Sequence, residues 1–217
     1  MGAVPLHQQT TVGFSPSTEK RQAVLLGTEL RGLARLSDAL DPSLVLFLAN
    51  EFFAFAAAIV ARHSGEPVTT QHEMLLSAFT RGSATHTAQQ AVRAAQQVQG
   101  EFPALAEKWR ASYGLRTAVA QGLHLGEVVL GLAGPKGLER RVAFGDSVTL
   151  AQAMVTRARA GEFVMSEAVL GALSVENLDL DAEPLPPLEL PRRTPIRIYG
   201  VLLEERLDFT AARANAA

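Results

Sequence analysis

The side chains that most often carry out chemistry are sparse in this sequence. It contains no cysteine, which excludes a thiol nucleophile, a disulfide framework, a cysteine-based zinc site and an iron–sulfur cluster. The five histidines are scattered along the chain, so their spacing predicts no metal cage. We expect His63, His86 and His124 to be structural or solvated rather than catalytic. No single cluster of residues in the sequence therefore defines an active site.

Charge and composition narrow the classes of partner. The chain has 20 Lys and Arg against 22 Asp and Glu, a net charge of −2. Because no basic excess is present, we expect neither nucleic-acid binding nor binding to an anionic membrane surface. With 217 residues, 47% of them hydrophobic, the chain can bury a full core and has the length of about one domain.

The hydrophobic periodicity alternates between strand-like and helix-like segments. Residues 1–20 are expected to form a flexible leader or linker, residues 21–206 the folded domain and residues 207–217 a flexible tail. The expected strands are residues 23–26, 67–71, 74–80, 115–132, 141–144, 163–165 and 197–203, and the expected helices are residues 44–61, 84–112 (as one or two helices) and 147–159. Strands interleaved with helices predict a mixed fold around one sheet.

Two segments have unusual composition. Glycines 122, 126 and 131 predict bends or bulges in the long strand at 115–132. Within residues 175–195, Pro184, Pro186, Pro187 and Pro191 predict an extended surface arm rather than a helix.

Residues 44–61 are the most lipid-like stretch of the sequence. Asp41 and Pro42 precede it and favour the start of a helix. Asn50 and Glu51 lie near its middle, which makes membrane insertion costly. We expect a helix buried in protein, covered on a second side by another subunit because it is apolar nearly all round. Without an apolar signal segment among the first twenty residues, a cytoplasmic location is expected.

Five blocks of sequence occur in an order that resembles the catalytic domain of class III adenylate and guanylate (nucleotidyl) cyclases. The resemblance spans about residues 22–203, and its most specific pieces are His124-x-Gly126-Glu127 and Gly145-Asp146-x-Val148. The blocks are VLLGTELRGLARLSD, RHSGEPVTTQHEMLLSAF, AVRAAQQVQ, GLHLGEVVLG and RVAFGDSVTLAQAMVTRARAGEFVMSEAV. The resemblance implies a ferredoxin-like α+β sandwich, with a central, mostly antiparallel sheet flanked by helices.

The resemblance also implies a mechanism. In such cyclases, two divalent ions held by two carboxylates activate the ribose 3′-oxygen for attack on the α-phosphorus. An Asn and an Arg from the partner subunit orient the ribose and stabilise the charge on the phosphorus. A Lys paired with an Asp or Thr reads the adenine. The active sites lie across a head-to-tail dimer interface.

The positions that carry these roles in the family hold other residues in this sequence. Only the two metal-binding positions, which hold glutamates in place of aspartates, are conservative changes; a glycine that precedes the second one is replaced by His72. The six positions are Glu29 and Glu73 for the metals, Thr69 and Val142 for the base, Thr149 for the Asn and Ala153 for the Arg.

These substitutions have different consequences. Ala153 removes the guanidinium, and losing an arginine finger costs roughly 10³–10⁵ in rate. Thr149 is too short to reproduce an Asn amide, while Thr69 and Val142 cannot select a base. Arg157, four residues after Ala153 on the same helix face, is a possible substitute displaced by about 6 Å. Glu29 and Glu73 are either a relocated metal pair or ordinary acids at strand ends.

We therefore expect a catalytically inactive cyclase-homology domain that acts as a dimerising, partner- or ligand-binding regulatory module in intracellular signalling. It would form a homodimer or heterodimer through the cyclase-type interface, with a protein partner possible, and we expect no cofactor. The alternative is a divergent cyclase that makes cAMP or cGMP with Mg²⁺ or Mn²⁺ on Glu29 and Glu73, alone or as half of a heterodimer. A third possibility is a sensor that binds a nucleotide or another small ligand in the vestigial cleft without turnover.

Overall fold

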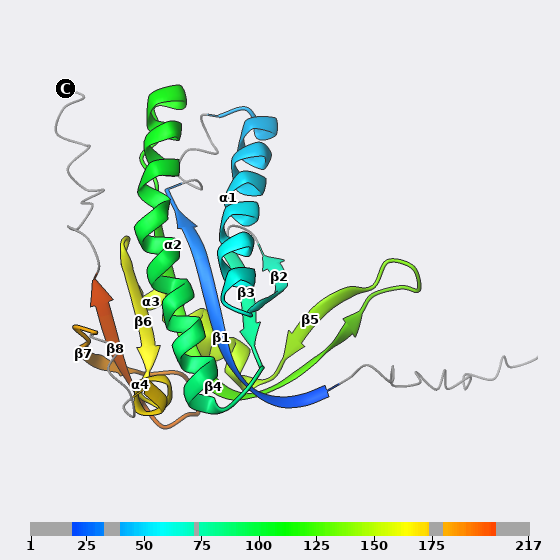
Figure 1. The fold of residues 1–217 in the computed structure, drawn as a ribbon, viewed down its shortest axis with the longest axis vertical. Helices are drawn as coiled ribbons and strands as arrows, with labels where there is room; N and C mark the ends of the chain where they lie inside the picture. Colours follow the sequence, from blue (N-terminus) through cyan, green and yellow to red (C-terminus); the bar gives the residue numbers. More distant parts are fainter. Residues whose placement is uncertain (1–18, 33–39, 72–73, 174–179, 203–217) are drawn as a thin grey trace, which may run out of the picture.

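The computed structural model describes residues 19–32, 40–71, 74–173 and 180–202. An eight-stranded sheet carries helices on both of its faces (Figure 1). The strands are β1 (Glu19–Arg31), β2 (Glu66–Gln71), β3 (Met74–Phe79), β4 (Ala118–Ala133), β5 (Arg140–Phe144), β6 (Glu162–Ser166), β7 (Glu183–Leu188) and β8 (Ile196–Leu202), and the helices are α1 (Pro42–Arg62), α2 (Ala84–Tyr113), α3 (Asp146–Arg157) and α4 (Glu167–Leu173). The expected flexible leader and tail lie almost wholly outside the described residues, except that Glu19 and Lys20 already belong to β1.

The strand order confirms the predicted fold class. The sheet runs β2-β3-β1-β4-β6-β8-β7, with β5 paired to β4 as an additional hairpin strand. The first six elements follow the chain order β1-α1-β2-β3-α2-β4, and their strands lie in the order β2-β3-β1-β4, which is the ferredoxin-like arrangement. Strand β4 pairs with β6 in parallel, whereas the other pairings in the described residues are antiparallel.

Alternation along β1 assigns each face of the sheet to a different set of helices. Val24 and Leu26 are fully buried in the cluster formed with α1, α2 and α4. Ala23 and Leu25, on the opposite face, pack in a second cluster with Ala151 of α3. Helices α1 and α2 lie side by side over one face, and α3 covers the other (Figure 1). We call the second one the α3 face.

Helix α1 is a core helix that also keeps an exposed apolar side. By length and composition it could cross a membrane. Within the domain, 28% of its most apolar window is buried. Glu51, near its middle, accepts a hydrogen bond from the indole Nε1 of the fully buried Trp109 at 2.8 Å. The side chains of Leu46 and Phe47 remain 63% and 52% exposed. The expected burial is therefore confirmed on one side, and the other side is open in the single chain.

Two glycines of β4, Gly122 and Gly126, serve close packing, and the predicted bulges are wrong for the pairing of this strand with β1. The pairing of β4 with β1 runs without a register shift from Leu130, opposite Glu19, to Ala118, opposite Arg31. A Cβ atom at Gly122 would lie 2.4 Å from the backbone nitrogen of Val155 in α3. Gly122 therefore lets the helix backbone lie directly on the sheet.

The proline-rich segment is extended, as predicted, but it pairs with the sheet instead of forming a free arm. Strand β7 is antiparallel to β8, with a register shift between Leu185 and Leu188. Proline lacks an amide hydrogen and is tolerated at a sheet edge, which is where β7 lies. The helix α4, which the sequence analysis did not predict, precedes residues 174–179, which lie outside the described residues.

A buried polar cluster lies beneath the start of α3. His124 of β4 is 9% exposed, and its Nδ1 lies 3.0 Å from the Ser166 hydroxyl of β6. Ser147, in the first turn of α3, donates a hydrogen bond to the carbonyl of Glu127 at 2.7 Å. Burial lowers the pKa of His124 below its ordinary value, with the Asp146 charge acting weakly in the opposite direction. The neutral imidazole is therefore part of the packed structure.

Replacing Gly122 by alanine should destabilise the domain. The added methyl would overlap α3 backbone atoms, and overpacking of this kind costs about 1–3 kcal/mol. Gly100→Ala in α2 is the matched control, because a Cβ there has open space around it and helix propensity favours alanine by about 0.5–1 kcal/mol. Urea unfolding should show opposite signs for the two substitutions; an unchanged free energy of unfolding in Gly122→Ala would contradict the packing.

The burial of His124 predicts a loss of stability in mild acid. Its folded-state pKa is lowered from 6.5, so the unfolded chain takes up a proton more readily and stability falls as the pH drops through and below that value. One group contributes at most about 1.4 kcal/mol per pH unit. Urea unfolding between pH 7.5 and 5 should show a steeper loss for the wild type than for His124→Gln. Equal pH dependence would contradict the assignment.

Candidate functional site

Glu29 lies near the end of β1, directly opposite Met74 at the start of β3. Because residues two apart on a strand share a face, Glu29 lies on the α3 face together with Ala23 and Leu25. Glu73, the other predicted metal ligand, immediately precedes Met74 and lies outside the described residues, as does His72. The structure thus places one of the two predicted carboxylates.

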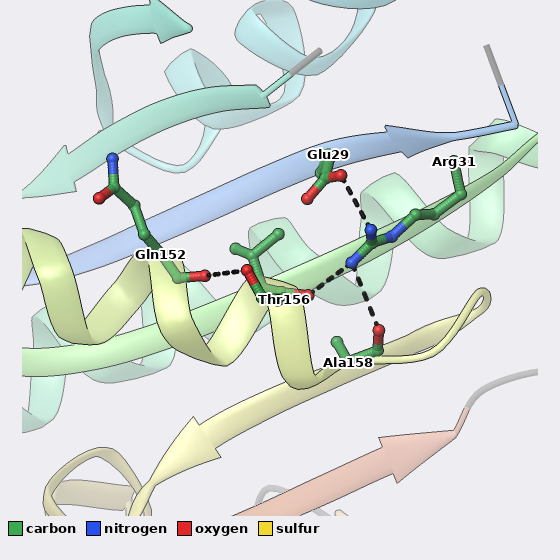
Figure 2. A network of polar contacts seen from close by, with 6 residues as sticks. Glu29, Arg31, Gln152, Thr156 and Ala158 are labelled. Atoms are coloured by element: carbon green, nitrogen blue, oxygen red, sulfur yellow. Dashed lines mark hydrogen bonds and ion pairs between the residues drawn. The ribbon is translucent and has the colours of Figure 1, made fainter. Parts of the chain in front are cut away.

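That carboxylate is bound to an arginine of the same strand. Arg31 donates from Nη1 to Glu29 Oε1 at 2.9 Å, and its Nη2 donates to the backbone carbonyls of Val155 at 2.7 Å and Ala158 at 3.5 Å (Figure 2). These carbonyls belong to the last turn and the C-cap of α3, where carbonyl groups lack helical partners and favour a cation. Arg31 therefore caps α3 and neutralises Glu29 at the same time.

The described residues around Glu29 do not fit a two-metal site. Mg²⁺ requires near-octahedral oxygen coordination that includes carboxylates, but Glu29 already accepts from a guanidinium. Within the described part of the chain, no group of three histidine, cysteine, aspartate or glutamate side chains is placed to hold a metal ion. Glu73 is not among these described residues.

Thr149 lies at the end of α3 opposite to the hydrogen bonds that Arg31 makes, and Ala153 lies between them along the helix. Thr149 is exposed near the start of the helix, and Ala153 is half-buried one turn later. Arg31 contacts the other end of the same helix, so Thr149 lies about 9 Å along the axis from the carbonyl of Val155. Within one chain, Thr149 therefore lies away from the end of α3 that Arg31 joins to Glu29. Arg157 is in the last turn of α3, and its role as a substitute stays a prediction.

The two base-reading positions lie on β2 and β5, which are joined by the ion pair of Glu66 and Arg141 at 2.5 Å. Thr69 of β2 pairs with Leu76, which belongs to the apolar cluster on the α3 face. Val142 of β5 pairs with Gly131, and its neighbour Ala143 packs against that same cluster. Successive strand residues point to opposite faces, so Val142 lies on the other side of the hairpin from Ala143. The role of Thr69 and Val142 as base-reading positions stays a prediction.

The sequence analysis missed Arg31, although it lay within a block that resembles the cyclases. The available signal was its spacing: residues two apart on a strand share a face. An arginine two residues from Glu29 on the same strand is a candidate counter-ion for its carboxylate. Its second partner, the end of α3, lies more than 120 residues away in sequence and could be identified only from the fold.

The β4–β5 hairpin, residues 128–144, extends away from the body of the sheet (Figure 1). We call it the arm. It exposes three large apolar side chains, Leu132, Leu138 and Phe144, at 48%, 72% and 62%. Exposed apolar side chains gathered on a projecting element are typical of protein–protein contacts.

Comparisons with known proteins agree with this fold. The adenylate and guanylate cyclase catalytic domain family matches residues 16–201. No curated protein matches the sequence. The chain is similar in structure to the adenylyl cyclase CyaB from P. aeruginosa, with 18% identity, a TM-score of 0.78 and coverage of 87% of this chain and 97% of that chain.

Two further solved structures show the same likeness. The guanylyl cyclase Cya2 has 22% identity and a TM-score of 0.75, covering 85% of this chain and 93% of its own. A dimeric guanylyl cyclase domain from the aquatic fungus Blastocladiella emersonii has 18% identity and a TM-score of 0.70, covering 85% and 98%. At these identities the structural likeness establishes the fold, and the family match covers most of the sequence. The chain therefore belongs to the adenylate and guanylate cyclase catalytic domain family.

Proposed function

We propose that this cyclase-family domain is catalytically inactive and acts as a dimerising regulatory module in intracellular signalling. The observation that carries the proposal is the contact between Glu29 and Arg31, at the position where the family holds a metal ion. The guanidinium supplies the positive charge that the carboxylate would otherwise take from a divalent cation.

The arginine is held too firmly to be displaced without cost. Its side chain is 29% exposed, and that of Glu29 is 23% exposed, so both are partly shielded from water. A hydrogen bond to a charged group contributes about 1.5–3 kcal/mol. Releasing Glu29 to a metal would break such a bond. Swinging the guanidinium away would also remove its hydrogen bonds to the carbonyls of Val155 and Ala158, leaving Val155 with only the 3.2 Å contact from the Ala158 amide.

The residues on α3 support the same conclusion. Ala153 has no hydrogen-bond donor for the transferring phosphoryl group, and the hydroxyl of Thr149 is shorter than an Asn amide. Removing one donor that stabilises a transition state costs roughly 10²–10³ in rate. A second copy could bring this α3 opposite Glu29, but it would still deliver a threonine and an alanine.

Dimerisation is supported by two surfaces. The arm carries Leu132, Leu138 and Phe144 into solvent, and the start of α1 exposes Leu46 and Phe47. The fungal relative is a dimeric guanylyl cyclase domain. Burying these side chains against a second copy, or against an intact cyclase domain as partner, would remove apolar area from water at about 25 cal/mol per Å².

Purified protein should convert neither ATP nor GTP to a cyclic nucleotide. The assay uses Mn²⁺, protein from a host strain that lacks its own adenylate cyclase, and mass-spectrometric detection of cAMP and cGMP. The expected signal equals the buffer control, because the Arg31 guanidinium occupies Glu29 and Ala153 stands where the family has its arginine.

Glu29→Gln is the matched control for that assay. Under the proposal it gives the same background as the wild type. Product from the wild type that Glu29→Gln abolishes would overturn the proposal and establish the alternative, a divergent cyclase that uses Glu29. An intact cyclase domain added as partner tests in the same way whether the chain works as half of a heterodimer.

Self-association should depend on the arm. Leu138→Asp places a charge on the most exposed apolar side chain of the described residues, so we expect the dimer dissociation constant in sedimentation experiments to rise by at least about tenfold, or 1.4 kcal/mol. Leu202→Asp makes the same change at an exposed leucine of β8, remote from the arm, and should leave the constant unaltered. A monomeric wild type, or equal effects of both substitutions, would rule out the arm as the interface.

A further inference from the structure

A polar pocket lies at the base of the arm, far from Glu29. Its volume is about 270 Å³, and it draws residues from the ends of several strands. Arg21 in its wall and Glu29 both lie on β1, eight positions apart, a separation of about 26 Å along an extended strand. The lining residues are Glu19, Arg21, Glu66, Thr80, Arg81, Leu130 and Arg141.

The pocket has an unbalanced charge. Its two carboxylates are each paired with an arginine, Glu19 with Arg21 at 2.6 Å and Glu66 with Arg141 at 2.5 Å. The third arginine, Arg81, has no hydrogen-bond or ion-pair partner within the part of the chain that the structure describes. Three guanidinium groups against two carboxylates leave one net positive charge, and it is concentrated in a concave site.

The chemistry of the lining selects a class of ligand. Guanidinium groups present planar, paired donors that match phosphate oxygens, and the hydroxyl of Thr80 adds a donor. Leu130 is the one apolar residue in the lining, so little surface suits a hydrophobic ligand. The volume falls below the range of about 300–1,000 Å³ that is typical for drug-sized ligands, but it accommodates a phosphoryl group.

We propose that this pocket binds a phosphoryl group, either as inorganic phosphate or as the phosphate end of a nucleotide whose base stays outside. The three arginines come from different elements: Arg21 from β1, Arg81 from the segment after β3, and Arg141 from β5 of the arm. A phosphate bound to Arg81, and to the guanidinium N–H groups of Arg21 and Arg141 that their carboxylate partners leave unused, joins the arm to the body of the sheet. Binding therefore reduces hydrogen exchange in residues 128–144.

The experiment titrates full-length protein with inorganic phosphate, ATP and adenosine at low ionic strength, where screening is weakest, using calorimetry. Arg81→Gln is the test variant, because Arg81 makes no hydrogen bond or ion pair with any residue that the structure describes. Arg140→Gln is the control, because it removes the same charge from the neighbouring position of β5 but does not line the pocket.

Phosphate or ATP should bind saturably to the wild type, at least about tenfold more weakly to Arg81→Gln, and with little change to Arg140→Gln. Tighter binding of ATP than of phosphate identifies a nucleotide as the source, equal or weaker binding identifies free phosphate, and adenosine should not bind in a way that depends on Arg81. Hydrogen exchange in the arm should slow with the ligand. The proposal is overturned if neither anion binds the wild type, if Arg81→Gln binds as the wild type does, or if both variants lose the same affinity.

Discussion

The guanidinium of Arg31 joins three parts of this domain that the chain order keeps apart. It neutralises Glu29 on its own strand and donates hydrogen bonds to two carbonyl groups at the end of α3. A metal ion on Glu29 could neutralise the carboxylate. It would not donate hydrogen bonds to the carbonyls of Val155 and Ala158 at the end of α3. One side chain therefore links the end of α3 to the charge of the candidate site.

The α3 face is built for close approach rather than for a wide cleft. Gly27 and Gly122 on neighbouring strands let the backbone and side chain of Val155 lie against the sheet, and a Cβ at either position would come within 2.5 Å of that residue. The buried contact between His124 and Ser166 supports the sheet beneath the other end of the helix. Thr149 and Ala153 are thus carried on a helix packed closely against the sheet, where Ala153 has no hydrogen-bond donor and the hydroxyl of Thr149 is shorter than an Asn amide. The scaffold of a cyclase is present, and its polar groups on this face stabilise the fold.

Much of this architecture could be predicted from the sequence, because it depends on local patterns. Asp41 and Pro42 marked the start of α1, and apolar runs located β1, β3 and β6. Gly122 of β4 was misinterpreted because its close neighbours are backbone atoms of a helix about thirty residues later, and no local pattern records such a contact. Strand β7 was expected to be a free arm, since a sequence shows its prolines but not the edge strand that accepts them. In the candidate site, residue types indicated the lost donors, whereas the role of Arg31 required the fold.

A crystal structure grown with Mn²⁺ and a non-hydrolysable ATP analogue, examined by anomalous scattering at the manganese edge, tests the central claim most directly. The account predicts that Arg31 stays on Glu29 and on the end of α3, with no manganese peak within coordination distance of the Glu29 carboxylate. A manganese ion bound to Glu29, with the guanidinium turned away and the α3 carbonyls released, would contradict it.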